Sequence, residues 1–225
     1  IYKTQKRIKM EVPWFELYMD EKEQDALVKT FQSKWVGIGP RVKEFEEKVA
    51  GYIGVRNAVA LSSGTAALDI ALKLLNIEYN DEVIVPGMAY IATVNSVLFQ
   101  KAIPVFADID PNHFGIDPFS VEELITEKTK CIIPINYAGH SIDWEKLRDL
   151  TDKKGIKIIE DGAASFGGEY KEKKLCSLGD ISITSFHIAK TFTTLEGGML
   201  FTNDDEYARK AKMIRSHGED PNKKY

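Results

Sequence analysis

The stretch that decides the fold spans residues 179–202 and reads GDISITSFHIAKTFTTLEGGMLFT. A β-branched run and a second apolar run enclose a lysine and a Gly-Gly pair, which predicts two strands joined by a tight connection. Lys190 falls at that connection, and its neighbours Ile188, Ala189 and Phe192 are apolar. Apolar surroundings lower the pKa of a lysine and free the amine to form a Schiff base with a carbonyl. Lys190 is therefore a candidate nucleophile, although a solvated surface charge is the commoner state of a lysine.

Composition limits the class of protein. With 225 residues, 44% hydrophobic and 28% charged, the chain can bury a sizeable core and is typical of a soluble globular protein. The net charge is -4 and the lysines alternate with acids, so we expect no nucleic-acid partner. No apolar run approaches the length of a membrane span. The two cysteines, Cys131 and Cys176, have no metal-like spacing, which predicts a cytoplasmic protein without a metal site.

The pattern divides the chain after residue 40. An N-terminal segment, residues 1–40, contains one helix that Asp20 caps and that ends near Ser33. Residues 41–225 form one large domain, which opens with a helix from Val42 to Tyr52. The chain lacks an initial methionine and ends at NKKY, so it is expected to be a fragment.

Short apolar runs alternate with longer amphipathic segments from residue 57 onward. We expect strands at 58–62, 82–86, 103–109, 130–136 and 156–162, and helices at 65–76, 91–101, 118–127 and 142–154. Strand and helix in alternation predict an α/β fold with a mostly parallel sheet covered by helices on both faces. Ligands of such sheets bind beyond the carboxyl ends of the strands.

The first strand runs into a helix through Ser63, Gly64 and Thr65. Glycine allows close backbone approach, and the amide groups and dipole of a helix N-terminus attract an anion. The hydroxyls of Ser63 and Thr65 add donors to this predicted anion cradle. A plain Ser/Thr helix cap, without any ligand, is the alternative interpretation.

Two further strand ends carry candidate ligand-binding side chains. Tyr90 follows the second strand, where its ring either covers a flat ligand or packs in the core. Asp161 ends the fifth strand, and a carboxylate in that buried place needs a cationic partner. That partner is either a lysine or arginine of the chain or a protonated ring nitrogen of a ligand.

One cofactor uses all of these groups. Pyridoxal phosphate (PLP) needs donors for its phosphate, an amine for its aldehyde and a carboxylate for its pyridine nitrogen. The anion cradle, Tyr90, Asp161 and Lys190 would supply them from one edge of the sheet.

Motifs in the same order resemble the DegT/DnrJ/EryC1/StrS family of sugar aminotransferases. They are SSGTAAL from Ser62, PGMAYIATVNSV, IPVFADID, IIEDGAASFG, and SFHIAK followed by LEGG, within residues 12–218. The resemblance implies the large domain of the aspartate aminotransferase-like fold (PLP fold type I). It also implies PLP as cofactor, a nucleotide-linked keto-sugar as substrate, glutamate or glutamine as amino donor, and a homodimer.

Site residues follow from the resemblance position by position. Lys190 would hold PLP as a Schiff base and shuttle a proton, Asp161 would pair with the pyridinium, and Tyr90 would stack on the ring. Gly64, Thr65 and Ser185 would hold the phosphate. His187 belongs to the motif without an assigned chemical role.

The chain departs from the family in two ways. Gly162, Ala163 and Ala164 follow Asp161, where the family commonly has Ala-Ala and then His or Gln. The chain also ends before the family's segment for the neighbouring subunit and its smaller C-terminal domain.

Three other functions stay open. The family's sugar dehydratase branch has histidine at the position of Lys190, which argues against that branch. Another PLP fold type I activity, such as an amino acid aminotransferase or a desulfurase, is the second alternative. A non-catalytic regulatory homologue is the third.

Overall fold

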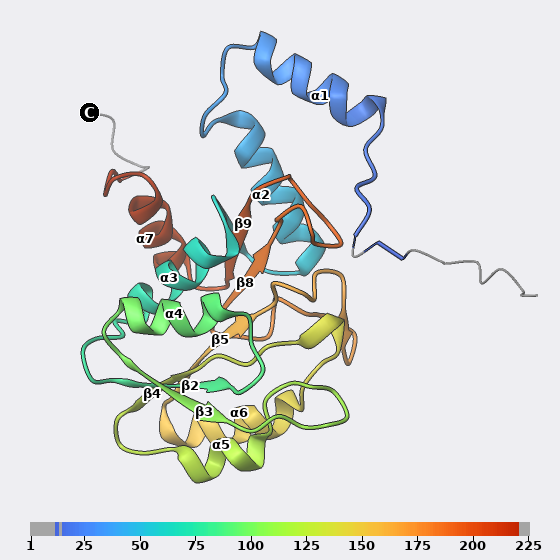
Figure 1. The fold of residues 1–225 in the computed structure, drawn as a ribbon. Helices are drawn as coiled ribbons and strands as arrows, with labels where there is room; N and C mark the ends of the chain where they lie inside the picture. The colour runs from blue at the N-terminus through green and yellow to red at the C-terminus, as the bar shows by residue number, and fades with distance from the viewer. Residues whose placement is uncertain (1–11, 14, 221–225) are drawn as a thin grey trace, which may run out of the picture.

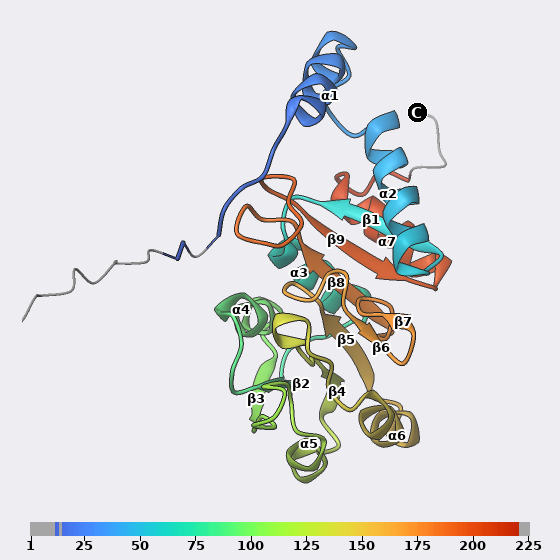
Figure 2. The same ribbon diagram turned by 90° about the vertical axis from the view of Figure 1, so that its right-hand side faces the viewer.

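A computed structural model describes residues 12, 13 and 15–220. Within them, a seven-stranded sheet has the order β1-β9-β8-β5-β4-β2-β3 (Figures 1 and 2). The strands are β1 (Asn57–Leu61), β2 (Glu82–Pro86), β3 (Ile103–Ala107), β4 (Thr129–Ile132), β5 (Lys157–Asp161), β8 (Ile181–Ser185) and β9 (Gly198–Thr202). Only β9 is antiparallel to its neighbours, so the mostly parallel sheet predicted from the sequence is confirmed.

Helices cover both faces of this sheet (Figure 2). The helices are α1 (Glu21–Gln32), α2 (Pro40–Ile53), α3 (Gly64–Leu74), α4 (Ile91–Phe99), α5 (Pro118–Leu124), α6 (Trp144–Lys154) and α7 (Asp205–Arg215), and all of them except α1 pack on the sheet. Apolar side chains of α3, α4 and α7 pack with one set of strand residues into the largest cluster of the core. The opposite face is covered by α2, α5 and α6 through two further clusters.

Alternation along β5 sorts its side chains between the two faces. Ile159 packs on the side of α3 and α4, whereas Ile158 packs on the side of α5 and α6. Because successive strand residues point to opposite faces, Asp161 lies on the side of Ile159 and Glu160 on the side of Ile158. This alternation places Asp161 on the face that α4 covers.

The connection after β8 differs from the prediction. The strands β8 and β9 pair antiparallel from Ser182↔Phe201 to Ser185↔Gly198, but residues 186–197 form a long loop between them instead of a tight turn. Bonds inside this loop replace a hairpin turn: the Thr194 N–H donates to the Phe186 carbonyl oxygen. The sequence also gave no separate signal for the short hairpin of β6 (Glu169–Tyr170) and β7 (Lys173–Lys174).

The N-terminal helix follows its prediction closely. Asp20 caps α1 through a capping box with Glu23, and the helix ends one residue before Ser33. No side chain of α1 is buried, whereas α2 packs on the sheet through Val49, Ala50 and Ile53. The predicted boundary after residue 40 therefore falls at the first turn of α2. Residues 1–11, 14 and 221–225 of the predicted segments lie outside the described residues.

Candidate active site

The predicted site residues meet at one edge of the sheet. The strands β1, β2, β5 and β8 are parallel to one another across the sheet, so their carboxyl ends lie along the same edge. Ser63 follows β1, Tyr90 follows β2, and Asp161 and Ser185 end β5 and β8. Lys190 lies in the loop that leaves β8 at this edge. The fold therefore brings together side chains that are up to 127 residues apart.

The start of α3 forms a capped helix N-terminus with spare donors. The Ser63 hydroxyl accepts a hydrogen bond from the Ala66 N–H at 3.1 Å, and the Ser63 carbonyl accepts from the Ala67 N–H at 3.1 Å. Ser63 is therefore a helix cap, as the alternative interpretation expected. The N–H groups of Gly64 and Thr65 have no acceptor within the described residues. An anion at this terminus would find these two donors.

Glycines allow three backbone segments to approach closely beside this terminus. A Cβ atom on Gly64 would lie 3.0 Å from the Ser185 Cβ. A Cβ atom on Gly198 would lie 2.2 Å from the Ser63 carbonyl carbon. Gly198 also pairs with Leu61 on one side and with Ser185 on the other. The sequence had marked the Gly-Gly pair without giving it this role, which is to let β9 pass the start of α3.

Asp161 is a buried carboxylate without an ion pair. Its side chain is 4% exposed, Oδ1 accepts from the Ala163 N–H at 3.0 Å, and Oδ2 accepts from the Thr93 hydroxyl at 2.9 Å. Among the described residues, no lysine, arginine or histidine forms an ion pair with it. Burial raises the pKa of Asp161, while these hydrogen bonds and the charge of Lys190 oppose that rise. The carboxylate therefore still has capacity for a cationic partner.

Lys190 lies in the loop after β8, and its charge lowers the pKa of Asp161. The Lys190 N–H donates to the His187 carbonyl oxygen at 2.9 Å. His187 Nδ1 accepts from the Ala189 N–H at 3.2 Å, and His187 Nε2 lies 3.7 Å from Glu196 Oε1. His187 thus makes structural contacts that shape the turn carrying Lys190.

Tyr90 projects from the start of α4. It is the N-cap residue of this helix, and its side chain is 78% exposed. The interpretation that Tyr90 packs in the core is therefore wrong, and its ring is free to cover a ligand. Thr93, one turn further along, was missed by the sequence analysis although it lies in the same PGMAYIATVNSV segment. Its spacing of three residues from Tyr90 was the available signal, because residues i and i+3 share a helix face.

The residues after Asp161 explain one departure from the family pattern. A Cβ atom on Gly162 would lie 2.3 Å from the Cys176 Sγ and 2.8 Å from the Ile183 carbonyl oxygen. Cys176 is fully buried, so an alanine at position 162 would clash with it. Ala164 is exposed, and its methyl group offers no hydrogen bond to a ligand.

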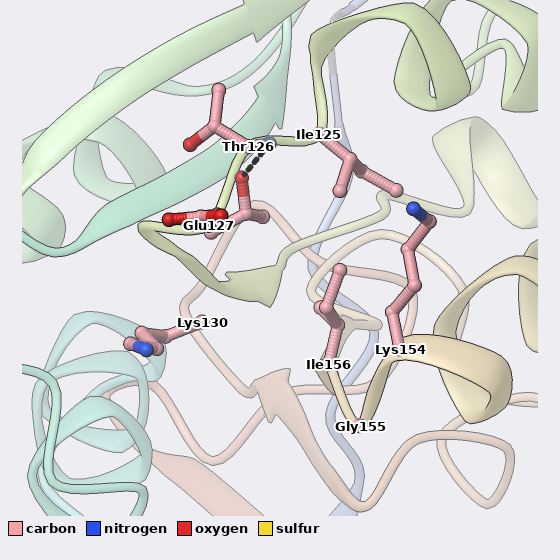
Figure 3. A pocket seen from close by; sticks show the side chains of 8 residues that line it. Ile125, Thr126, Glu127, Lys130, Lys154, Gly155 and Ile156 are labelled. Atoms are coloured by element: carbon pink, nitrogen blue, oxygen red, sulfur yellow. Dashed lines mark hydrogen bonds between the residues drawn. The ribbon is translucent and has the colours of Figure 1, made fainter.

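A cavity of about 500 Å³ lies elsewhere in the molecule (Figure 3). It is lined by residues before and at the start of β4 and at the end of α6, including Thr126, Lys130 and Lys154. It borders the start of β4, and the start of β5 follows Ile156 in its lining, so it lies at the edge opposite the candidate site. None of the candidate residues lines this cavity.

Residues 12, 13 and 15–220 contain no cluster of three or more histidine, cysteine or acidic side chains suited to a metal ion. No helix among them has the length and apolar character needed to cross a bilayer.

The residues present at this edge fit PLP. Gly64 and Thr65 offer free N–H donors to a phosphate, and Ser185 packs closely against Gly64 at the same terminus. Asp161 is a buried carboxylate without a cation, as a pyridinium would require. Lys190 supplies an amine on the same side. These three demands of the cofactor are met by independent elements of the fold.

Comparison with known proteins agrees with this fit. Residues 17–225 match the model of the DegT/DnrJ/EryC1/StrS aminotransferase family. The chain is 40% identical over 208 residues to GDP-perosamine synthase of Caulobacter vibrioides, covering 92% of this chain and 56% of that protein. It is 40% identical over 184 residues to UDP-2-acetamido-2-deoxy-3-oxo-D-glucuronate aminotransferase of Pseudomonas aeruginosa, covering 81% and 51%. The solved aminotransferase from Psychrobacter cryohalolentis superposes with a TM-score of 0.90 at 36% identity, covering 93% and 53%.

These relatives also define the fold and the cofactor. The fold is the aspartate aminotransferase-like large domain of PLP fold type I, as predicted. PLP is the cofactor of the family, and similar solved structures include a PLP form and a pyridoxamine phosphate form. The chain spans about half the length of the curated relatives it matches. On this combination of fold, site and sequence match, the chain belongs to the DegT/DnrJ/EryC1/StrS aminotransferase family.

Proposed function

We propose that the complete protein is a PLP-dependent aminotransferase that transfers an amino group from glutamate or glutamine to a nucleotide-linked keto-sugar. The observation that carries this proposal is a buried carboxylate without an ion pair, Asp161, at the same sheet edge as Lys190, whose charge acts on it. The named relatives support the substrate class, because one is a GDP-sugar synthase and another a UDP-sugar aminotransferase. The product would serve amino sugar biosynthesis.

Each site residue has a proposed role in holding the cofactor. The N–H groups of Gly64 and Thr65, the Thr65 hydroxyl and the Ser185 hydroxyl would bind its phosphate. Ser63, which the sequence analysis included among the binding residues, contributes by capping α3 and orienting these donors. Asp161 would pair with the protonated ring nitrogen, and the exposed Tyr90 side chain would cover the ring.

The chemistry divides between the cofactor and the chain. When bound, PLP supplies an aldehyde for amines and a ring that accepts electrons. Lys190 Nζ takes a proton from the α-carbon of the amino donor in the first half of the reaction and returns a proton to the sugar carbon in the second. The charge of Asp161 keeps the ring nitrogen protonated throughout. Neither role needs a metal ion.

Two further properties belong to the proposal. We expect a homodimer, which the large apolar side chains exposed on α4 and β3 support: Ile91, Phe99 and Phe106 are 59%, 66% and 56% exposed. We also expect a cytoplasmic location, since both cysteines are free and buried.

The decisive experiment uses the complete protein. Purified protein should show the visible absorbance of lysine-bound PLP, and glutamate should remove that band. A panel of nucleotide-linked keto-sugars, with glutamate as donor and product mass as readout, should then identify the substrate. Protein that binds PLP but aminates amino acid precursors instead would assign it to another fold type I activity. Protein that binds no PLP would point to a non-catalytic homologue.

A further inference from the structure

Thr93 links two elements at the candidate site. It lies in the first turn of α4, its side chain is 1% exposed, and its hydroxyl donates to Asp161 Oδ2 at 2.9 Å. The two residues are 68 positions apart in the sequence. This hydrogen bond therefore connects the start of α4 with the end of β5.

The two oxygens of Asp161 are held from different directions. Oδ1 accepts from the Ala163 backbone N–H, and Oδ2 accepts from the Thr93 hydroxyl. Within the described part of the chain, Thr93 is the only side chain that donates to this carboxylate. With one bond at each oxygen, the plane of the carboxylate is fixed against rotation. Without the hydroxyl, only the loop after β5 would orient it.

The same helical turn also carries Tyr90. The Thr93 N–H donates to the Tyr90 carbonyl oxygen at 3.0 Å, which closes the first turn of α4. A residue that is anchored to Asp161 through its side chain and to Tyr90 through its backbone sets the position of both. The carboxylate and the exposed ring are therefore parts of one arrangement.

We propose that Thr93 is a positioning residue of the active site, whose hydroxyl orients the Asp161 carboxylate toward the ring nitrogen of PLP and fixes the turn that presents Tyr90. This inference rests on the proposed function. A hydrogen bond to a carboxylate favours its charged form, so the hydroxyl also opposes the rise that burial imposes on the pKa of Asp161. The orientation of the carboxylate and the effect on its pKa both act through Asp161, and neither requires Thr93 to touch the reacting atoms.

Three variants of the complete protein test the role. Thr93→Val keeps the branched shape and removes the hydroxyl, whereas Thr93→Ser keeps the hydroxyl. Ser96→Ala is the matched control, because Ser96 is another fully buried hydroxyl of α4 that donates to the Ala92 carbonyl oxygen at 2.8 Å. PLP affinity is measured for each by titrating the cofactor-free protein, followed by absorbance and fluorescence, from pH 5 to pH 9.

We expect Thr93→Val to weaken PLP binding by about tenfold, since hydrogen bonds to charged groups are among the stronger ones. Thr93→Ser should stay within about threefold of wild type, and Ser96→Ala should bind PLP as wild type does. Loss of the hydroxyl raises the pKa of Asp161, so the affinity of Thr93→Val should begin to fall at a higher pH on acidification. A role of Thr93 in folding alone would not change the pH at which PLP affinity begins to fall.

The outcomes separate this inference from the proposed function. If wild type binds PLP and Asp161→Asn weakens that binding, but Thr93→Val has wild-type affinity at every pH from 5 to 9, the positioning role is wrong and the proposed function stands. If wild type binds no PLP, the proposed function itself fails. Should Thr93→Val not fold, Thr93→Ala replaces it in the same titration, with Thr93→Ser as its rescue.

Discussion

Two consecutive carboxylates at the end of β5 are held in opposite ways on the two faces of the sheet. Glu160 and Asp161 are 0% and 4% exposed, and burial raises the pKa of each. Glu160 accepts five hydrogen bonds, from the side chains of Asn136 and Ser182 and from the N–H groups of Cys176, Leu178 and Gly179. Asp161 accepts two.

This difference separates a structural carboxylate from one that is available to a ligand. The chain itself saturates Glu160, and those bonds fix the segment between the β6–β7 hairpin and β8. Asp161 has fewer donors and no ion pair within the described residues, so it can still accept a cation. A buried acid that is incompletely satisfied by its own chain points to a binding site.

Replacing Lys190 should have the largest effect, and Lys174 provides a control lysine outside the candidate site. Lys190 lies on the side of Asp161, whereas Lys174 lies in the hairpin and pairs with Glu169. Lys190→Ala should reduce turnover by about 10³-fold or more, because it removes both the attachment point and the proton carrier. Lys174→Ala should leave turnover unchanged. Steady-state kinetics with the identified sugar measures both, and wild-type turnover in Lys190→Ala would refute the role of Lys190.

Asp161→Asn should separate activity from stability. We expect turnover to fall by about 10² to 10³-fold, since asparagine cannot hold the ring nitrogen protonated. The fold should tolerate the change: the amide oxygen can still accept from the Ala163 N–H, and the Thr93 hydroxyl can accept from the amide nitrogen.

The cofactor-free Asp161→Asn protein should even be more stable than wild type at pH 7. Burial raises the folded-state pKa of Asp161, so its contribution to stability is present below about pH 4, the unfolded pKa, and is lost as pH rises through the folded pKa. Asparagine has no such loss, and we expect a gain of about 1 kcal/mol in the free energy of unfolding by urea denaturation. A less stable variant at pH 7 would show that the charge is already compensated within the chain.

The sequence predicted the strands and the residues that end them because both depend on local pattern. Buried parallel strands are short apolar runs, and Asp161 interrupts such a run with a charge. The strand limits of β2 and the helix start of α4 were predicted to the residue. Asp20 was also recognised as a cap, since its capping box lies within four residues.

Contacts between distant segments could not be predicted in this way. Position 162 requires glycine because a Cβ atom there would clash with Cys176, and Thr93 gains its role from its hydrogen bond to Asp161. Neither partner is marked by any local spacing. Glu160 and Asp161 are neighbours in the sequence, and the pleat of β5 sends the two carboxylates to opposite faces of the sheet.

Glu160→Gln should lower stability and leave PLP affinity nearly unchanged, which is the reverse of what we expect for Asp161→Asn. Each oxygen of Glu160 faces donors only, and the backbone N–H groups of Leu178 and Gly179 cannot become acceptors. Placing an amide nitrogen against them should cost about 2 kcal/mol in the free energy of unfolding. PLP affinity should change less than twofold, because Glu160 lies on the opposite face. Loss of PLP binding without loss of stability would mean that the two carboxylates act together.

An aromatic stack connects the two faces and allows the smallest test. Phe192, two residues after Lys190, stacks on Phe166 with ring centroids 5.4 Å apart, and Phe166 stacks on Tyr52 of α2 at 5.5 Å. The stack thereby ties the Lys190 loop to the helix that covers the other face. Phe192 is 45% exposed, so its burial contributes only modestly to the core.

Phe192→Leu should lower the free energy of unfolding by about 1 kcal/mol, as expected for a lost aromatic pair. If the stack steadies the turn that carries Lys190, turnover should fall by a few fold while PLP affinity stays close to that of wild type. Tyr52→Leu removes the far end of the stack and should reduce stability similarly with a smaller effect on turnover. Equal kinetic effects of the two variants would show that the stack acts through overall stability, because the ring contacts among the described residues connect Tyr52 to Phe192 through Phe166.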